Sequence, residues 1–416
     1  MLNTLFTQAL GLVPPWQVDD VDFNQPEGAI HFRLRFGAAK GTCPVCQLGD
    51  QPIHDRQTRQ WQHLNFFQYR AFLHAEVPRI ACQCGKTTQV DVPWANPRSG
   101  FTLLFEAYAL VLARHLPVAE VARMLGVLPQ RLWARLEACV MAAYDAESFS
   151  DVREITVDET AMRRGHQYVT VIADAKARKV IFATEGKDQL TLSDFASELT
   201  SHGATPQQIE HVSMDFSAAF IAGAREHLPN ADISFDPFHL VALASAAVDQ
   251  VRREEVKSEP ILRKQRYSLL KSEAKWTTQQ ANFMADFRSS HLKTARAWRF
   301  KESLRDIVAA KDDAATTRAA LDRLIAWAQR SRLKPLITFG GTLKKHLDGI
   351  VRAISERRSN GFAEGLNSAI QAAKQRARGF KTADNLISII YLIAGKLKNL
   401  PTSPMRTTGA VKAGFA

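Results

Sequence analysis

The sequence contains no long uncharged hydrophobic run, no basic leader and few cysteines, and each absence excludes a class of protein. A membrane-spanning helix needs about twenty nearly uncharged apolar residues. The apolar run at 386–395 is too short, and the run at 103–116 contains Glu106 and Arg114. The N-terminus lacks the basic n-region of a secretory signal. We therefore expect a cytoplasmic protein that does not contact a membrane, in which five cysteines do not form a disulfide framework.

Acidic residues are scarce in the second part of the chain. The whole sequence has 54 Lys and Arg against 42 Asp and Glu, a net charge of +12. Residues 251–416 alone carry a net charge of +19, whereas residues 1–250 carry −7. Such asymmetry favours a polyanionic partner for the basic part, with nucleic acid as the first candidate. The alternative is a set of solvated helix faces that are rich in Lys and Arg.

Hydrophobic patterning predicts a multidomain α/β protein. Short strands and turns are predicted over the first hundred residues, including the alternating run 31–36, and a helical stretch follows over 101–144. Three hairpin-like strands and then alternating helices and strands indicate a mixed α/β sheet. Its expected strands are 154–158, 168–174, 179–186, 211–215 and 231–236, and its expected helices are 191–200 and 217–228.

The rest of the chain is predicted to be helical. Helices are expected over 238–330 and 347–398, with the stretch 332–346 broken by Pro335 and Gly340–Gly341. With 416 residues, two to four domains are expected. The proposed segments are 1–98 (zinc module), 99–148 (helix-turn-helix), 149–250 (first part of the core), 251–346 (helical insertion), 347–400 (second part of the core) and 401–416 (tail).

Four cysteines near the N-terminus have the spacing of a zinc site. Cys43 and Cys46 form a CPVC pair, and Cys82 and Cys84 form a second pair with one intervening residue. Zinc binds four ligands in tetrahedral geometry, and a tight turn supplies two of them with little strain. A small β-rich module is expected to bury little core, so the metal would supply stability. The alternatives are free thiols, or a histidine in place of one cysteine: His54, His63 or His74.

Residues 102–143 have the pattern of a helix-turn-helix. A short helix over 118–125 ends at Gly126, which permits the turn, and a second helix begins near Pro129. Burial of Leu132 and Leu136 leaves the polar side of that helix for base edges and phosphates. The predicted DNA contacts are Gln130, Arg131, Trp133 and Arg135. An ordinary helical hairpin is the alternative.

Three acidic residues could form a site for divalent metal. Asp158 and Asp215 each end a strand-like run, and Glu364 lies one turn inside a helix that opens at 359–361. Two magnesium ions about 3.5–4 Å apart can hold the attacking and leaving oxygens of a phosphoryl displacement, and Mg²⁺ prefers oxygen ligands. We expect Asp158 to be shared by both ions, Asp215 to bind one and Glu364 the other; manganese could substitute. The same helix carries further predicted DNA contacts: Asn367, Lys374, Arg376 and Arg378.

The order of these motifs resembles the bacterial insertion-sequence transposases of the ISL3 group. The resemblance rests on the cysteine pairs, the helix-turn-helix, ITVDE, VSMD, FDPFH and SNGFAEGLNSAIQAAKQRARGF, and covers about residues 40–400. It implies a ribonuclease H-like catalytic core in the bacterial cytoplasm or nucleoid, with an Asp-Asp-Glu triad at Asp158, Asp215 and Glu364. It also implies a helical insertion between the second Asp and the Glu. The single residue between Cys82 and Cys84 departs from the pattern of the group and leaves the zinc ligands open.

Three other residues have two interpretations each. Asp236 and His239, in the FDPFH motif, either support the metal site or merely cap a helix. Trp298 lies in a basic helix of the insertion. Aromatics at helical spacing usually belong to a core, but Trp298 could also stack on a flipped base at a DNA end.

The sequence as a whole predicts a DNA transposase. The N-terminal modules would bind terminal inverted repeats, and the core would cleave a phosphodiester and join the freed 3′-hydroxyl to target DNA. Because two DNA ends must be joined, a homodimer or larger assembly is expected. The alternatives are a zinc-containing transcriptional regulator without catalysis and a nuclease that cuts but does not join strands.

Overall fold

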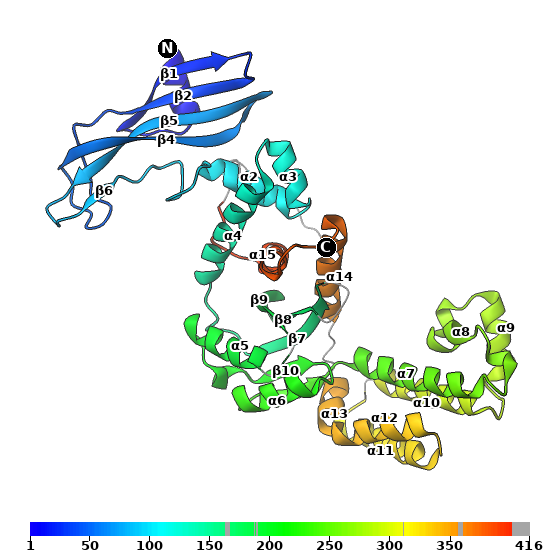
Figure 1. Ribbon diagram of the computed structural model, residues 1–416. Coiled ribbons are helices and arrows are strands. Elements are labelled where there is room, and N and C mark those ends of the chain that lie inside the picture. The colour runs from blue at the N-terminus through cyan, green and yellow to red at the C-terminus, as the bar shows by residue number, and fades with distance from the viewer. Residues whose placement is uncertain (163–166, 187, 189, 311, 357–360, 402–416) are drawn as a thin grey trace. The chain divides into compact units, whose positions relative to one another are not determined.

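The computed structural model describes residues 1–162, 167–186, 188, 190–310, 312–356 and 361–401 (Figure 1). The chain forms two compact units, which are described separately. The first combines Met1–Glu147 with the chain from Ala372 onward, and the second is Ser148–Gln371. Each unit contains a sheet and helices, so the mixed α/β prediction is confirmed. Of the predicted tail, 401–416, all but residue 401 lies outside the described residues.

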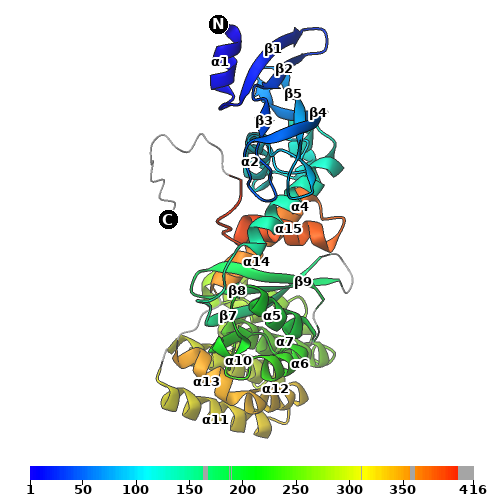
Figure 2. The same ribbon diagram turned by 90° about the vertical axis from the view of Figure 1, so that its left-hand side faces the viewer.

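The first unit begins with helix α1 (Leu2–Ala9), which lies beside the first strand of a six-stranded sheet (Figure 2). The sheet order is β1-β2-β5-β4-β3, and β6 pairs with β5. Its strands are β1 (Trp16–Asn24), β2 (Ala29–Phe36), β3 (Lys40–Gly41), β4 (Gln51–Phe66), β5 (Tyr69–Ala81) and β6 (Thr87–Gln89). The predicted strand 31–36 lies in β2. The expectation of short strands throughout is wrong, because β4 and β5 form a hairpin of 16 and 13 residues.

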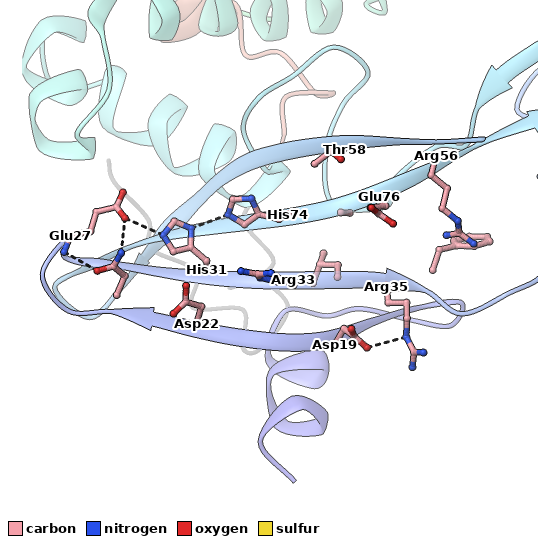
Figure 3. Close-up of a pocket in the computed structure, with 14 residues that line it drawn as sticks. Asp19, Asp22, Glu27, His31, Arg33, Arg35, Arg56, Thr58, His74 and Glu76 are labelled. Atoms are coloured by element: carbon pink, nitrogen blue, oxygen red, sulfur yellow. Dashed lines mark hydrogen bonds and ion pairs between the residues drawn. The ribbon is translucent and has the colours of Figure 1, made fainter. Parts of the chain in front are cut away.

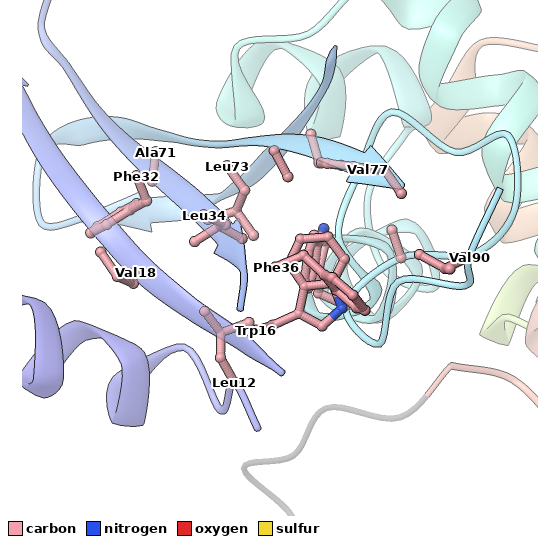
Figure 4. Packing of buried hydrophobic residues seen from close by; sticks show 14 of the residues in the cluster. Leu12, Trp16, Val18, Phe32, Leu34, Phe36, Ala71, Leu73, Val77 and Val90 are labelled. Atoms are coloured by element: carbon pink, nitrogen blue, oxygen red, sulfur yellow. The ribbon is translucent and has the colours of Figure 1, made fainter. Parts of the chain in front are cut away.

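This sheet buries a substantial core on one face (Figure 4). The rings of Trp16 and Trp61 pack edge-on against Trp94, with centroid distances of 4.8 and 5.4 Å. The expectation that the N-terminal module buries little core is therefore wrong: the alternating strands β2 and β5 turn a row of apolar side chains to one face. The opposite face is polar and carries the His31–His74 pair and the Asp19–Arg35 ion pair (Figure 3).

Three helices follow the sheet: α2 (Leu103–Ala113), α3 (Val118–Leu125) and α4 (Pro129–Asp145). Gly126 ends α3 in the left-handed conformation (φ 65°), and Pro129 is the first residue of α4, as the sequence predicts. Helix α15 (Ala383–Ala394) packs on α4, where the rings of Tyr144 and Tyr391 lie 4.3 Å apart. Residues from 372 onward thus belong with this unit, whereas the sequence grouped all of 347–400 together; the domain boundaries stay a prediction.

The second unit contains a five-stranded sheet with the order β11-β10-β7-β8-β9. Strands β7, β8 and β9 are antiparallel neighbours, whereas β10 and β11 run parallel to β7. This mixed sheet agrees with the ribonuclease H-like core that the resemblance implies. The elements lie near the predicted positions: β7 (Glu154–Ala161), β8 (Tyr168–Asp174), β9 (Lys179–Glu185), α5 (Leu190–Ser201), β10 (His211–Met214), α6 (Ala218–His227) and β11 (Asp232–Phe235). The prediction that Asp158 ends its strand is wrong, because β7 continues to Ala161 through its pairing with β8.

Helices make up the rest of this unit. They are α7 (Pro237–Glu255), α8 (Arg266–Leu270), α9 (Thr278–Phe287), α10 (Lys293–Ala310), α11 (Ala314–Arg330), α12 (Lys334–Lys345), α13 (Leu347–Ser355) and, up to Gln371, α14 (Gly361–Ala377). Short 3₁₀ turns lie at Pro206–Gln208, Pro260–Leu262 and Glu273–Lys275. Helix α7 packs against α10 and α12, and α13 lies on β11.

The predicted break over 332–346 is wrong, because α12 is continuous there. Pro335 lies in the first turn, where its missing N–H costs no helical hydrogen bond. Gly340 lies against α11, and a Cβ at this position would come within 2.7 Å of the Cβ of Ala328. The glycine therefore allows close packing of the two helices and does not interrupt α12.

Candidate functional site

The four cysteines of the first unit gather into one cluster. Their sulfur atoms all lie within 4.8 Å of one another, and those of Cys46 and Cys82 are 3.4 Å apart. Gly85, with φ of +79°, permits the tight turn that brings in Cys84 despite the one-residue spacing. Two of the alternative ligands are occupied elsewhere: His63 lies 2.8 Å from the hydroxyl of Thr102, and His74 lies 2.9 Å from His31.

The cluster has the donor set of a structural zinc site. Four thiolates in tetrahedral arrangement are characteristic of zinc, which requires the deprotonated form. The backbone N–H of Cys46 lowers the pKa of Cys43 to about 6. The N–H of Cys84 acts in the same direction on Cys82, but burial and the neighbouring thiols raise its pKa to about 12. The residues present therefore fit zinc.

The predicted DNA contacts of α4 divide into two groups. Gln130 and Arg131 are exposed at the start of the helix, and Arg131 stacks on the ring of Phe101 with its guanidinium carbon 4.4 Å from the centroid. Arg135 instead forms an ion pair with the buried carboxylate of Glu106. Arg135 is half-buried, and Glu106 also accepts hydrogen bonds from Ser99 (2.6 Å) and Asn96 (2.8 Å); the DNA contact of Arg135 stays a prediction. Trp133 is half-buried and lies edge-on to Phe380.

In the second unit, three aspartates form a row across neighbouring parallel strands. Ser213 of β10 pairs with Thr156 of β7, and this register continued by two positions places Asp215 beside Asp158. Met214 pairs with Phe235 of β11, so the next residues, Asp215 and Asp236, are also neighbours. Adjacent strands lie about 4.8 Å apart, and register partners point to the same face. The topology therefore aligns three aspartates in one row: Asp215 and Asp236 directly after the C-terminal ends of β10 and β11, and Asp158 within β7.

Each of these carboxylates accepts a hydrogen bond from the backbone that follows it. The N–H of Glu159 donates to Asp158 (2.7 Å), that of Ser217 to Asp215 (2.9 Å) and that of Phe238 to Asp236 (3.0 Å). Asp236 thus caps α7, and its other oxygen lies 3.0 Å from Nδ1 of His239. The side chains are held in fixed orientations by local structure.

The charges of the row act on one another. Burial raises the pKa of Asp158 to about 6, and the carboxylates of Asp215 and Asp236 add to the increase, while the N–H of Glu159 and His239 oppose it. Asp236 raises the pKa of His239, with smaller contributions from the other two aspartates. The site concentrates negative charge in a partly buried place, an arrangement that a divalent cation would stabilise.

Helix α14 lies along β7 and brings its own polar side chains to the row. The amide of Asn367 donates to Asp158 (2.5 Å), and that of Gln371 donates to the hydroxyl of Thr160 (2.7 Å). Four residues of helix advance about 6 Å and two residues of strand about 6.6 Å, so successive contacts stay in register. The DNA contact predicted for Asn367 stays a prediction beside this hydrogen bond. Gln371 was not predicted, although its spacing of four from Asn367 indicates a shared face.

Glu364 lies one turn before Asn367 on α14 and is exposed. Among the described residues, the cysteine cluster alone has three or more potential ligands within 4.8 Å of one another, so the three predicted acids are not gathered that closely. Two ions about 3.5–4 Å apart need ligands spread over a wider site. Ser359 and Asn360, which open the predicted motif, lie outside the described residues.

The remaining predicted DNA contacts have different surroundings. Trp298 is 9% exposed on the inner side of α10, so a base cannot stack on it in this structure, and the core interpretation from helical spacing fits instead. Arg376 is exposed and donates to the backbone oxygen of His115 (3.0 Å), Arg378 is exposed, and burial lowers the pKa of Lys374. None of the described helices is long and apolar enough to cross a bilayer.

Comparisons with known proteins agree with this organisation. Residues 155–390 match a family model described as transposase. Residues 90–140 match the helix-turn-helix domain of transposase family ISL3, and residues 39–85 match the zinc-finger of the transposases of IS204, IS1001, IS1096 and IS1165.

Curated relatives resemble the chain over nearly its whole length. The transposase for insertion sequence element IS1557 of Mycobacterium tuberculosis is 29% identical over 95% of this chain and 97% of the relative. The transposase for insertion sequence element IS1001 of Bordetella parapertussis is 25% identical over 92% and 96%, respectively. Because the transposase model matches more than half of the chain, the protein belongs to the ISL3 family of insertion-sequence transposases.

Proposed function

We propose that this DNA transposase cleaves and joins DNA at a site in which Asp158, Asp215 and Glu364 hold two magnesium ions. The observation that carries the proposal is the strand register, which aligns Asp158 with Asp215 on one face of the sheet. The raised pKa of Asp158 adds support, since crowded carboxylates favour a cation. The ions would neutralise charge on the phosphodiester and lower the pKa of the attacking water or hydroxyl. Manganese could take their place.

The neighbouring side chains would prepare the carboxylates for this task. Asn367 orients Asp158 through its amide, and His239 holds Asp236 at the end of the row. We assign Asp236 and His239 a positioning role beside the ligands, because second-shell hydrogen bonds fix the orientation of metal-binding side chains.

The first unit would recognise the DNA. Gln130, Arg131 and Trp133 on α4 are proposed to contact the terminal inverted repeats, and Lys374, Arg376 and Arg378 to contact phosphates. The cysteine cluster would hold a structural zinc ion. Since two ends are joined in one reaction, we propose a homodimer or larger assembly at work in the bacterial cytoplasm on nucleoid DNA.

A cleavage assay tests the catalytic assignment. Wild-type protein incubated with a supercoiled plasmid that carries the element's ends and Mg²⁺ is expected to nick it, whereas Asp158→Ala is expected to lose activity by a factor of at least about 10². Asp322→Asn, an exposed acid on α11, is the matched control and should cut normally.

The same assay separates the alternatives. Undiminished cleavage by Asp158→Ala would contradict the proposed site. Binding without cleavage by the wild-type protein would favour a regulator, and cleavage without strand joining would favour a nuclease.

A further inference from the structure

An open groove lies along α7 and is closed on its other side by Arg266 and Leu270 of α8; it begins at Phe238, two residues after Asp236. It has a volume of about 490 Å³, and its floor is formed by the small residues Ala242, Ser245 and Ala246. Phe238 lies at the end next to Asp236 and His239, and Arg253 and Arg266 lie at the other end. From residue 238 to residue 253 the helix advances about 22 Å, a length of several nucleotides.

Phe238 offers an exposed aromatic face beside Asp236 and His239, the proposed positioning residues. Its side chain is 63% exposed, although it lies between a buried aspartate and a half-buried histidine in the sequence. Its ring stands edge-on to that of His239, with centroids 6.0 Å apart. Stacking of a base on such a ring does not depend on the identity of the base.

The far end of the groove carries an excess of positive charge. Asp249 pairs with Arg252 at 2.8 Å and with Arg253 and Arg266 at 3.5 Å each. One carboxylate thus faces three guanidinium groups. Arg253 and Arg266 are 65% and 55% exposed, so each can donate to a phosphate while it stays close to Asp249.

We infer that this groove binds an unpaired DNA strand next to the bond that is cut, with a base stacked on Phe238 and phosphates bound by Arg253 and Arg266. The volume is that of a small-ligand pocket, and a base can stack on Phe238 only where it is not stacked within a duplex. The small residues of the floor let the sugar-phosphate backbone approach α7. This inference rests on the proposed function, and it gives Phe238 the stacking role that the sequence suggested for Trp298.

Strand binding by the full-length protein tests the inference. The probe is a fluorescent oligo(dT) containing one 5-iododeoxyuridine, with anisotropy and ultraviolet cross-linking measured in EDTA so that cleavage does not contribute. Phe238→Ala is expected to weaken binding about tenfold and to remove the cross-link to the α7 peptide. The control Ile261→Ala alters another exposed apolar residue (62%) outside the groove and should retain both. Replacing Arg253 and Arg266 together by Ala should reduce the slope of log K against log salt by about 1.4.

Each other outcome overturns the inference. If Phe238→Ala and Ile261→Ala bind oligo(dT) and cross-link to it equally well, the groove does not bind the strand as inferred. If the wild-type protein still cuts its plasmid in Mg²⁺ in that case, the proposed function stands. If Phe238→Ala loses duplex binding by the same factor as oligo(dT) binding, the groove does not select single strands. A change in sedimentation of Phe238→Ala without a change in strand binding would identify the surface as a contact between two copies of the chain.

Discussion

At the scale of single residues, the candidate site is defined by the burial of Asp158 and by the charged groups around it. Burial raises the pKa of Asp158 to about 6, compared with an ordinary value of 3.8. The charge of Asp215 raises this pKa further, whereas the charge of His239 lowers it. Above pH 6 the folded protein must therefore hold a charge that solvent would stabilise better. Without metal, the ionised carboxylate of Asp158 therefore lowers the stability of the folded protein.

Replacement of Asp158 should expose this cost. Because the folded-state pKa is raised, the protein gains stability from protonation at low pH and loses it as the pH rises through about 6. Asp158→Asn is expected to raise the melting temperature in EDTA at pH 7.5 by a few degrees, corresponding to about 1–3 kcal/mol, with a smaller difference at pH 5. Scanning calorimetry measures these melting temperatures, and the control Asp322→Asn should melt like the wild type. An unchanged or lower melting temperature of Asp158→Asn at pH 7.5 would contradict the assignment.

At the scale of elements, the long β4–β5 hairpin changes the role expected for zinc. The sequence suggested that the metal compensates for a missing core, but Trp16, Trp61 and Trp94 give the sheet a core of its own. The cysteine cluster instead holds the turns after Cys43 and Cys82, where few apolar side chains are buried. Zinc should therefore order these turns and leave the sheet folded.

Removal of zinc tests this difference. Cys46→Ser, or treatment with a strong chelator, is expected to increase hydrogen exchange over 42–49 and 82–86, while the tryptophan emission of the buried core stays blue-shifted. Cys139→Ala, which changes a cysteine outside the cluster, is the control. Cooperative loss of the tryptophan signal on chelation would show that the metal supports the whole sheet.

At the scale of the whole molecule, the chain returns to its first unit after completing the second. Helix α15 contributes the buried residues Ile390 and Tyr391, and Tyr391 packs on Tyr144 of α4. The helix-turn-helix therefore depends on residues more than two hundred positions away in sequence.

A fragment that ends at residue 147 should consequently be unstable. The fragment retains the sheet, α2, α3 and α4, but it exposes the apolar side of α4 to water. Loss of a large buried aromatic side chain typically lowers the free energy of unfolding by about 3–5 kcal/mol. We expect the fragment to aggregate or to melt well below the intact protein, and a peptide of residues 378–401 to restore part of its stability. A fragment that melts like the intact protein would contradict this dependence.

The sequence by itself determined most local elements and the chemistry they carry: the cysteine pairs, the turn at Gly126, the strands that end just before Asp215 and Asp236, and the resemblance to a transposase family. These follow from short-range backbone preferences and from the alternation of side chains, both of which are visible over a few residues. Only the tertiary structure decided which of those side chains meet. It directed Arg135 to Glu106, Asn367 to Asp158 and Trp298 into a core, and it left Phe238 exposed. Such partners come from distant segments, and no local pattern encodes their contacts.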